Sequence, residues 1–371
     1  MKANLFLALA LLGLTSALPI SSEEITKNAA KGLRLLSLSD TKPLVWKTED
    51  EKLELIKADI GFFDVTDTYE TDLANEAREL DVKIEATYAA PSHKAEVTPI
   101  LAALSTTNMQ NYLATLTAFN NRYYKSTTGA QASQSIFNTL KDIANGKSGI
   151  TVSEFTHSWG QSSIIARFDA SGPITILGAH LDSVNSRDPT NGRSPGADDD
   201  GTGTVNLIES FRALVAANFK PSTPVEFHFY SGEEGGLLGS QAIATNYKSA
   251  GKAVKAMIEF DMTAYFAPGS KEVFAVNTDY ADAGLNTFIG QLASAYSLLP
   301  VANDKCGYAC SDHASWYKSG FPTAHPFEAV TGNDNPNIHS TGDTTSVNGF
   351  SWAHSLQFAK LATAFAYELG I

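Results

Sequence analysis

The sequence predicts an α/β fold, a single globular domain in which a mixed, largely parallel central sheet is flanked by helices. Apolar runs typical of buried strands recur at 174–178, 225–230 and 254–260, and near-continuous runs of this kind characterise parallel sheets covered on both faces. Between the first two runs, apolar residues at helical spacing predict a buried helix face formed by Val205, Ile208, Phe211 and Val215. With 371 residues, the chain is long enough to bury such a core.

The N-terminus has the order of features found in secretory signal peptides. Lys2 is followed by an apolar stretch from Leu5 to Leu14 and then by the small residues Thr15-Ser16-Ala17. Roughly ten apolar residues are too few to span about 30 Å of hydrocarbon, which argues against a membrane anchor. We therefore expect residues 1–17 to be removed after Ala17, and the protein to be secreted and extracellular, without membrane attachment.

Residues 18–87 have the character of a pro-segment. They are rich in charge, show helical spacing at 51–56, and contain none of the residues assigned to chemistry below. An ordinary N-terminal subdomain is the alternative. The stretch from Ala89 to Lys94 looks like a flexible junction, so we expect a second, larger unit over residues 88–371.

The net charge limits which partners the protein can bind, and the cysteines bear on the redox state of its compartment. The formal net charge of −13, with no cluster of Lys and Arg among aromatic residues, excludes nucleic acid as a natural partner. The two cysteines, Cys306 and Cys310, lie close together. In an oxidising compartment we expect them to form a disulfide rather than a metal clip or two idle thiols.

Each of the three predicted strands runs into residue types that bind metals. The first is followed by His180-Leu181-Asp182, the second by Glu233-Glu234 and the third by Asp261, while three consecutive aspartates at 198–200 precede the predicted helix. Loops at the carboxyl ends of parallel strands converge, and adjacent carboxylates repel unless cations hold them. Imidazole and carboxylate ligands without thiolates suit zinc in an open catalytic site, or cobalt or manganese, rather than a closed structural zinc.

Taken together, the motifs resemble those of secreted fungal leucine aminopeptidases with two co-catalytic zinc ions, and of their bacterial secreted relatives. The resemblance covers Ala89 to the C-terminus and rests on six motifs in the same order, at 180–182, 195–201, 232–235, 260–262, 306–313 and 338–339. It implies a zinc-peptidase-like catalytic domain over 88–371 with two Zn²⁺ per subunit. The implied activity removes bulky apolar, leucine-like residues from peptides with a free N-terminus; we expect a monomer.

The resemblance also implies the metal ligands. Asp199 would bridge the two ions, His180 and Asp261 would complete one, and Glu234 and His339 the other. Five ligands with one shared give three per ion, which leaves each ion an open position for water.

Three further residues receive catalytic roles. Successive residues in a tight turn point to different places, so Glu233 is free to act as the general base when Glu234 is a ligand. Asp182, two residues after a ligating histidine, can accept the other N–H of that imidazole. Tyr308 or the second zinc would steady the oxyanion. The resemblance further implies a cis peptide bond between Asp199 and Asp200.

An apolar specificity pocket is implied for a set of residues that are otherwise ordinary core residues: Met262, Cys306, Tyr308, Cys310, Phe327 and Ile338. The segment around them departs from the family pattern at His325, where an apolar side chain is expected, and this puts the size and polarity preference in doubt.

Other functions remain open at this stage. A single-zinc aminoacyltransferase or cyclase shares the fold, and a zinc carboxypeptidase would need a cationic group for a terminal carboxylate, for which only Arg187 and Arg193 accompany the motifs. A catalytically inactive ectodomain should have lost a ligand or the base, and this chain retains all of them.

Overall fold

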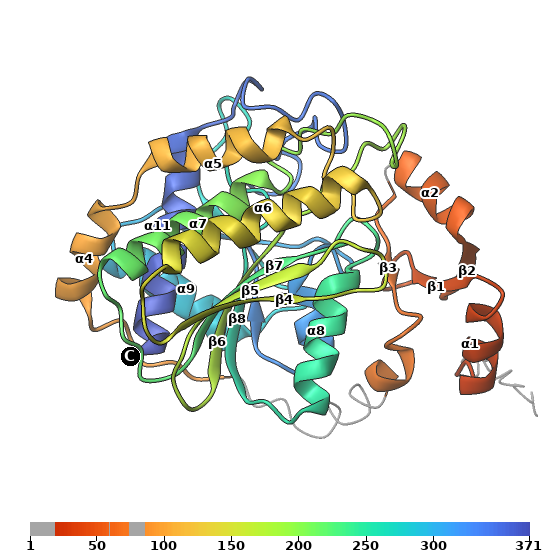
Figure 1. Ribbon diagram of the computed structural model, residues 1–371, viewed down its shortest axis with the longest axis horizontal. Helices are drawn as coiled ribbons and strands as arrows, with labels where there is room; N and C mark the ends of the chain where they lie inside the picture. The colour runs from red at the N-terminus through yellow and green to blue at the C-terminus, as the bar shows by residue number, and fades with distance from the viewer. Residues whose placement is uncertain (1–18, 59, 74–85) are drawn as a thin grey trace, which may run out of the picture.

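The computed structural model describes residues 19–58, 60–73 and 86–371, so the predicted signal peptide lies outside the described residues. The fold is built around a six-stranded sheet in the order β11-β8-β6-β7-β5-β4 (Figure 1). Its strands are β4 (Ile150–Phe155), β5 (Ser163–Phe168), β6 (Ile174–His180), β7 (Val225–Tyr230), β8 (Val254–Glu259) and β11 (Thr323–Ala324). The strands β11, β8, β6 and β7 run parallel to one another. The strand β5 pairs antiparallel with β7 on one side and with β4 on the other. The prediction of a mixed, largely parallel sheet is confirmed.

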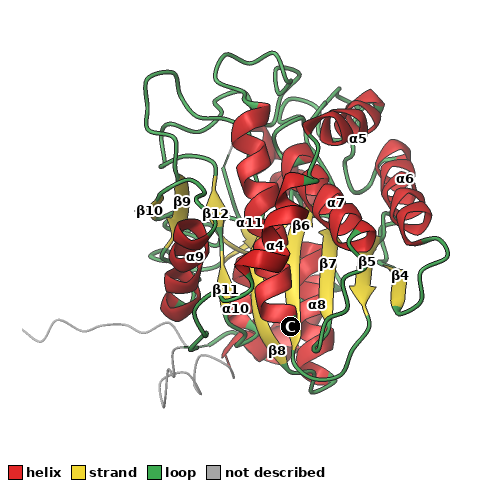
Figure 2. Cartoon of the chain, turned by 90° about the vertical axis from the view of Figure 1, so that its left-hand side faces the viewer, coloured by secondary structure: helices red, strands yellow, loops and turns green. Residues whose placement is uncertain are grey.

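Helices cover both faces of this sheet, as Figures 1 and 2 show. One face packs against α6 (Thr127–Ala144), α7 (Gly201–Ala216) and α11 (Trp352–Gly370), with α4 (Lys94–Ala102), α5 (Thr106–Ala118) and α9 (Ala283–Ala295) around them. The other face packs against α8 (Leu238–Ser249) and α10 (His313–Lys318). The predicted helix between the first two parallel strands is α7, which is buried almost all round because it lies between the sheet and other helices.

The antiparallel side of the sheet ends at β4, which Figure 2 shows at one margin. Along β4, Thr151, Ser153 and Glu154 are exposed, whereas β5 beside it is almost wholly buried. A second, smaller sheet has the order β10-β9-β12 and consists of β9 (Phe274–Asn277), β10 (Val301–Asp304) and β12 (Pro326–Phe327). These outer strands were not predicted from the sequence.

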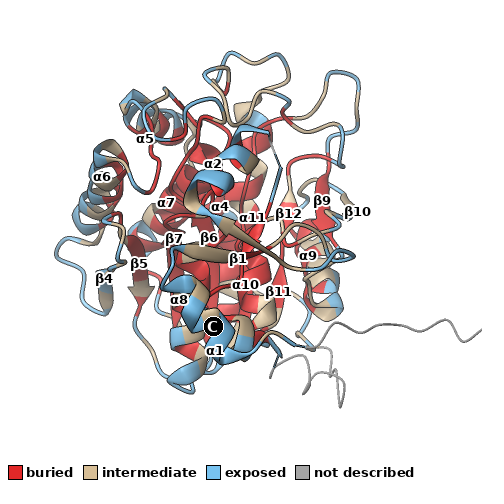
Figure 3. Ribbon diagram, turned by 90° about the vertical axis from the view of Figure 1, so that its right-hand side faces the viewer, coloured by how far each residue is buried: buried red, intermediate tan, exposed pale blue. Residues whose placement is uncertain are grey.

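The described part of residues 18–87, the predicted pro-segment, forms a small layer of its own. It contains α1 (Ser22–Ala29), β1 (Leu33–Ser37), β2 (Val45–Thr48), α2 (Glu49–Lys57) and β3 (Phe63–Asp64), with the antiparallel order β2-β1-β3. The helix predicted at 51–56 is α2, which begins with a capping box between Thr48 and Glu51. Figure 3 shows this layer on the side that faces the viewer, with much of α1 and α2 exposed. Within the described ranges, no helix has the length and apolar character needed to cross a membrane.

Candidate metal centre

The predicted metal ligands come from loops at one edge of the central sheet. His180 is the last residue of β6, the turn 231–237 follows β7, and Asp261 follows β8. Because β7, β6 and β8 are neighbouring parallel strands, their carboxyl ends lie together. The aspartates at 198–200 are brought to the same edge by the N-terminus of α7.

Asp199 lies between two groups of potential ligands. Its Oδ1 is 3.0 Å from Nε2 of His180, which is itself 3.4 Å from Oδ1 of Asp261. Its Oδ2 is 3.1 Å from Nε2 of His339, which is 3.3 Å from Oε2 of Glu234. The two oxygens of one carboxylate thus face two separate sets of donors, which is the arrangement that a carboxylate bridging two ions requires.

Asp200 also lies near His180 and Asp261, but its oxygens already have partners. Oδ1 accepts the backbone N–H of Gly203 and Met262, and Oδ2 accepts that of His180. Asp200 therefore caps α7 and ties three segments together, and Asp199 is the aspartate left for ligation. The peptide bond between Asp199 and Asp200 is cis, as expected.

Several buried polar atoms in this group fit a cation. Among the described residues, Oε1 of Glu234 and Oδ1 of Asp261 are buried without a hydrogen-bond partner. Leaving a buried acceptor unpaired costs about 1–3 kcal/mol, and more for a charged group. Burial raises the pKa of Glu234 to about 7, with the charge of Asp199 adding to the effect. Burial opposes ionisation of Asp199 too, but hydrogen bonds from His180 and His339 lower its pKa below the ordinary value.

Asp182 holds the turn that carries Glu233 and Glu234. Its Oδ1 accepts the backbone N–H of Glu233 at 3.1 Å, and its Oδ2 accepts that of Glu234 at 3.3 Å. Nδ1 of His180 lies 3.5 Å from Oδ1 of Asp182 and makes no hydrogen bond of good geometry. The predicted contact with the imidazole is therefore loose, and the firmer contacts orient the two glutamates.

Two buried residues that sequence reasoning missed hold the same loops. Asp343 accepts the backbone N–H of Asp198 and of Asp199. Arg122 is fully buried and donates to the carbonyl oxygens of Leu181 and, at 2.6 and 2.8 Å, of Pro195 and Gly196. Each of these residues is distant in sequence from the loops that it holds and is not part of a recognisable motif. No sequence signal therefore marked either residue.

We expect Arg122→Met to destabilise the fold by about 3–5 kcal/mol, because it takes the side-chain donor from the buried carbonyls of Leu181 and Pro195 and removes the cation near a cluster of buried carboxylates. The check is urea unfolding with metal present. Arg193→Met is the matched control, since exposed Arg193 also donates to two carbonyls, of Phe119 and Thr117; its cost should stay below about 1 kcal/mol. Equal losses in both variants would contradict a special role for Arg122.

The ligand cluster opens into a cavity of about 320 Å³. Glu233, Tyr308 and every residue predicted for the specificity pocket line it, together with the predicted ligands other than His180. Cys306 and Cys310 form a disulfide bond, as predicted. His325 also lines the cavity, so the departure from the family pattern lies in the pocket wall itself.

The predicted pro-segment contributes to the same cavity. Ile56, Ile60, Gly61 and Phe62 line it, and a Cβ atom on Gly61 would lie 2.6 Å from Oη of Tyr308. At Gly236, which has φ +101°, the carbonyl oxygen accepts the backbone N–H of Asp64. The pro-segment therefore contacts both Tyr308 and the turn that carries Glu233 and Glu234.

Comparison with known proteins agrees with these features. Residues 163–366 match the model of Peptidase family M28. The chain is 40% identical over 363 residues to leucine aminopeptidase 1 of Neurospora crassa, covering 95% of this chain and 88% of that protein. It is 42% identical over 338 residues to leucine aminopeptidase 1 of Phaeosphaeria nodorum, covering 87% and 85%. The crystal structure of Legionella pneumophila LapA aminopeptidase is similar with a TM-score of 0.79 at 27% identity, covering 91% of this chain and 98% of that chain.

Proposed function

Because the chain belongs to peptidase family M28, we propose that it is a secreted zinc aminopeptidase that removes bulky apolar residues, leucine above all, from the free N-termini of peptides. The position of Asp199 carries the proposal, since its two oxygens face His180 on one side and His339 on the other. The names of the fungal relatives support leucine as the preferred residue.

The residues present fit two zinc ions. His180, Asp199 and Asp261 would hold one, and Asp199, Glu234 and His339 the other, with imidazole and carboxylate donors that zinc accepts. When bound, such ions supply a nucleophile at neutral pH, polarise the scissile carbonyl and anchor a free α-amine.

The remaining steps fall to side chains around the cavity. Glu233 takes the proton of the attacking water and returns it to the leaving amine, and Asp182 keeps Glu233 in place through the backbone. Tyr308 donates to the oxyanion. Met262, Cys306, Cys310, Phe327 and Ile338 receive the apolar side chain of the substrate.

Secretion rests on the signal-like pattern of residues 1–17 and is consistent with the Cys306–Cys310 disulfide, a bond that persists in oxidising compartments. The pro-segment, residues 18–87, would keep the enzyme inactive until its removal, because four of its residues line the cavity.

Hydrolysis of leucine amide and of N-acetyl-leucine amide by the processed enzyme tests this function. We expect the acetylated substrate to react about 10⁴-fold more slowly, because a site built to bind a polar group rejects substrates that lack it. A chelator should abolish the activity, and zinc should restore it. Comparable rates on the two substrates, or activity that survives chelation, would exclude a zinc aminopeptidase; release of C-terminal residues would indicate a carboxypeptidase.

A further inference from the structure

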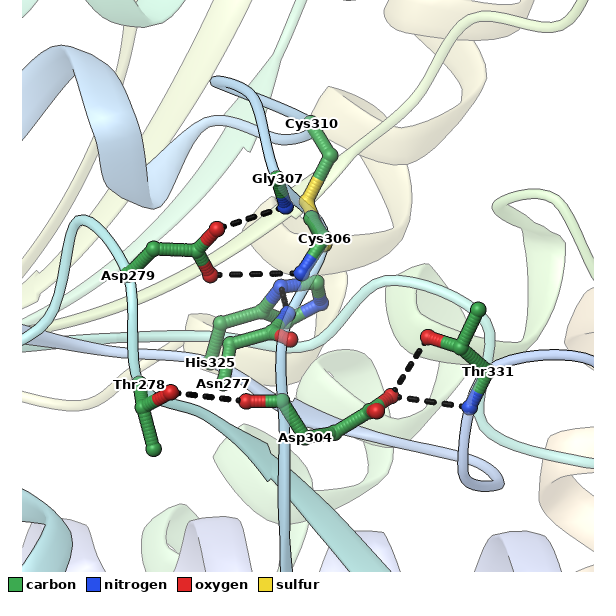
Figure 4. The surroundings of a disulfide bond; sticks show 9 residues. All are labelled: Asn277, Thr278, Asp279, Asp304, Cys306, Gly307, Cys310, His325 and Thr331. Carbon is green, nitrogen blue, oxygen red and sulfur yellow. Dashed lines mark hydrogen bonds between the residues drawn. A yellow bond between two sulfur atoms is a disulfide. The ribbon is translucent and has the colours of Figure 1, made fainter. Parts of the chain in front are cut away.

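A second group of potential ligands lies in the wall of the cavity, apart from the five residues around Asp199. It consists of the Cys306–Cys310 disulfide, His313 at the start of α10, and His325 between β11 and β12. One ligand atom each from Cys310, His313 and His325 lie within 4.8 Å of one another. Figure 4 shows the ring of His325 next to the disulfide and beside Asn277.

The two imidazoles are buried with few hydrogen-bond partners. His313 and His325 are 1% and 2% exposed, and their ring centroids are 4.6 Å apart. Among the described residues, neither nitrogen of His313 nor Nε2 of His325 makes a hydrogen bond of good geometry, although a backbone group of Asp279 lies near His313 and one of Asp261 near His325. Nδ1 of His325 lies 2.9 Å from Nδ2 of Asn277. Each unpaired buried nitrogen costs about 1–3 kcal/mol, which a bound ligand would recover.

Imidazole supplies a suitable ligand at both positions, because a neutral imidazole nitrogen is a common ligand for zinc.

The disulfide prevents the sulfur atoms of Cys306 and Cys310 from binding a metal. A sulfur in a disulfide has no thiolate charge, and the thiolate is the form of cysteine that binds metal. A dithiol reductant can open the bond by exchange: two cysteine thiols form while the reductant becomes a disulfide. Metal binding then releases the two thiol protons. The spacing of Cys306 and Cys310, with three residues between them, falls within the range of structural zinc sites.

We propose that reduction of the Cys306–Cys310 disulfide creates a separate site for a zinc-like divalent cation, formed by Cys306, Cys310, His313 and His325. Two thiolates and two neutral imidazoles would give a divalent cation four ligands and a site with no net charge.

The surrounding structure holds the Cys306 end of the turn without the disulfide. The carboxylate of Asp279 accepts the backbone N–H of Cys306 at 3.2 Å and of Gly307 at 2.6 Å, as Figure 4 shows. His313 is fixed by α10, and His325 by Asn277. The Cys306 to Cys310 turn therefore has an anchor that survives reduction. Because Cys306, Cys310 and His325 line the cavity, a cation here would also reshape the substrate pocket.

Cobalt titration of the full chain tests the site, because Co²⁺ replaces zinc and reports its ligands by absorption. A phosphine reductant opens the disulfide, being oxidised to its oxide as water supplies the oxygen and the two thiol protons. We expect the reduced chain to gain a sulfur-to-cobalt charge-transfer band and the visible bands of tetrahedral cobalt, while the oxidised chain gains no such sulfur band. The carboxylate and imidazole ligands around Asp199 cannot produce this band, so the result does not depend on the proposed aminopeptidase activity.

Variants separate the four-residue site from chelation by the cysteines alone. His313→Phe and His325→Phe should each weaken the cobalt affinity that the sulfur band reports by at least about tenfold, on the scale of lost metal-site contacts. His93→Phe, a change on the distant N-terminal side of α4, should leave it unchanged. Absence of the sulfur band in the reduced chain, an unchanged affinity in both histidine variants, or loss of the native circular dichroism spectrum on reduction would each overturn the proposal.

Discussion

Replacing Glu233 with Gln is expected to lower kcat by about 10²–10⁴-fold or more while both metal ions stay bound. General-base assistance alone accounts for a factor of this size, and Glu233 also has to pass the proton on to the leaving amine. Its side chain lines the cavity, and the short contact to His339 is made by Glu234. Steady-state kinetics with metal analysis of the purified variant measures both effects.

Glu234→Gln is the matched control, because the same isosteric change one residue later should act on metal binding. Asp182 holds the backbone N–H of both residues in the same way, so the turn should keep its shape in either variant. We expect Glu234→Gln to lose part of its metal. If instead Glu233→Gln loses metal while Glu234→Gln retains it, Glu233 is the ligand and Glu234 the base. Full activity of both variants would refute the proposed active site.

Removal of the pro-segment is expected to raise kcat/KM for leucyl substrates by at least about tenfold. If the segment covers the cavity with a free energy of only 1.4 kcal/mol, about a tenth of the molecules have an open cavity. The contacts indicate that the segment is held more firmly than this. Phe62 packs with Tyr123, Tyr124 and Val184 of the larger unit, and Gln241 donates to the carbonyl oxygen of Asp64.

The experiment begins with folded precursor, so that a role of the pro-segment in folding does not obscure the result. A protease site introduced at Ala89 and Ala90, both exposed, separates the two parts, and the larger part is then purified and assayed. Phe62→Ser in the uncleaved chain should also raise activity. Lys47→Ala should not, because the ion pair that Lys47 makes among the described residues is with Glu51 of the same segment. Uncleaved precursor as active as the purified larger part would reduce the pro-segment to a folding aid.

The parts of the fold that could be predicted are those with strong local patterns. The strands β6, β7 and β8 are long apolar runs, and each is followed at once by a metal-binding residue type, so strand and ligand were found together. The same holds for α7, whose apolar spacing begins directly after the three aspartates. Where a side chain and its role belong to one short segment, the sequence contains both.

The rest depends on contacts between distant segments. Arg122 reaches carbonyls 59 to 74 residues further along the chain, and Asp343 lies about 145 residues from the loop that it holds. Neither has a neighbouring motif, because each acts on the backbone of another segment. The strands β4 and β5 were missed since β4 alternates weakly and exposes polar residues. The contact of Ile56, Ile60, Gly61 and Phe62 with the cavity follows only from how the two parts of the chain pack.

The way in which the central sheet ends has a consequence for the protein at high concentration. At one side the last strand, β11, has only two residues, and at the other β4 presents Thr151, Ser153 and the charge of Glu154 to solvent. Short or charged edge strands are poor templates for strand pairing between molecules. A second copy therefore gains little by extending the sheet, which protects the folded chain against β-type aggregation.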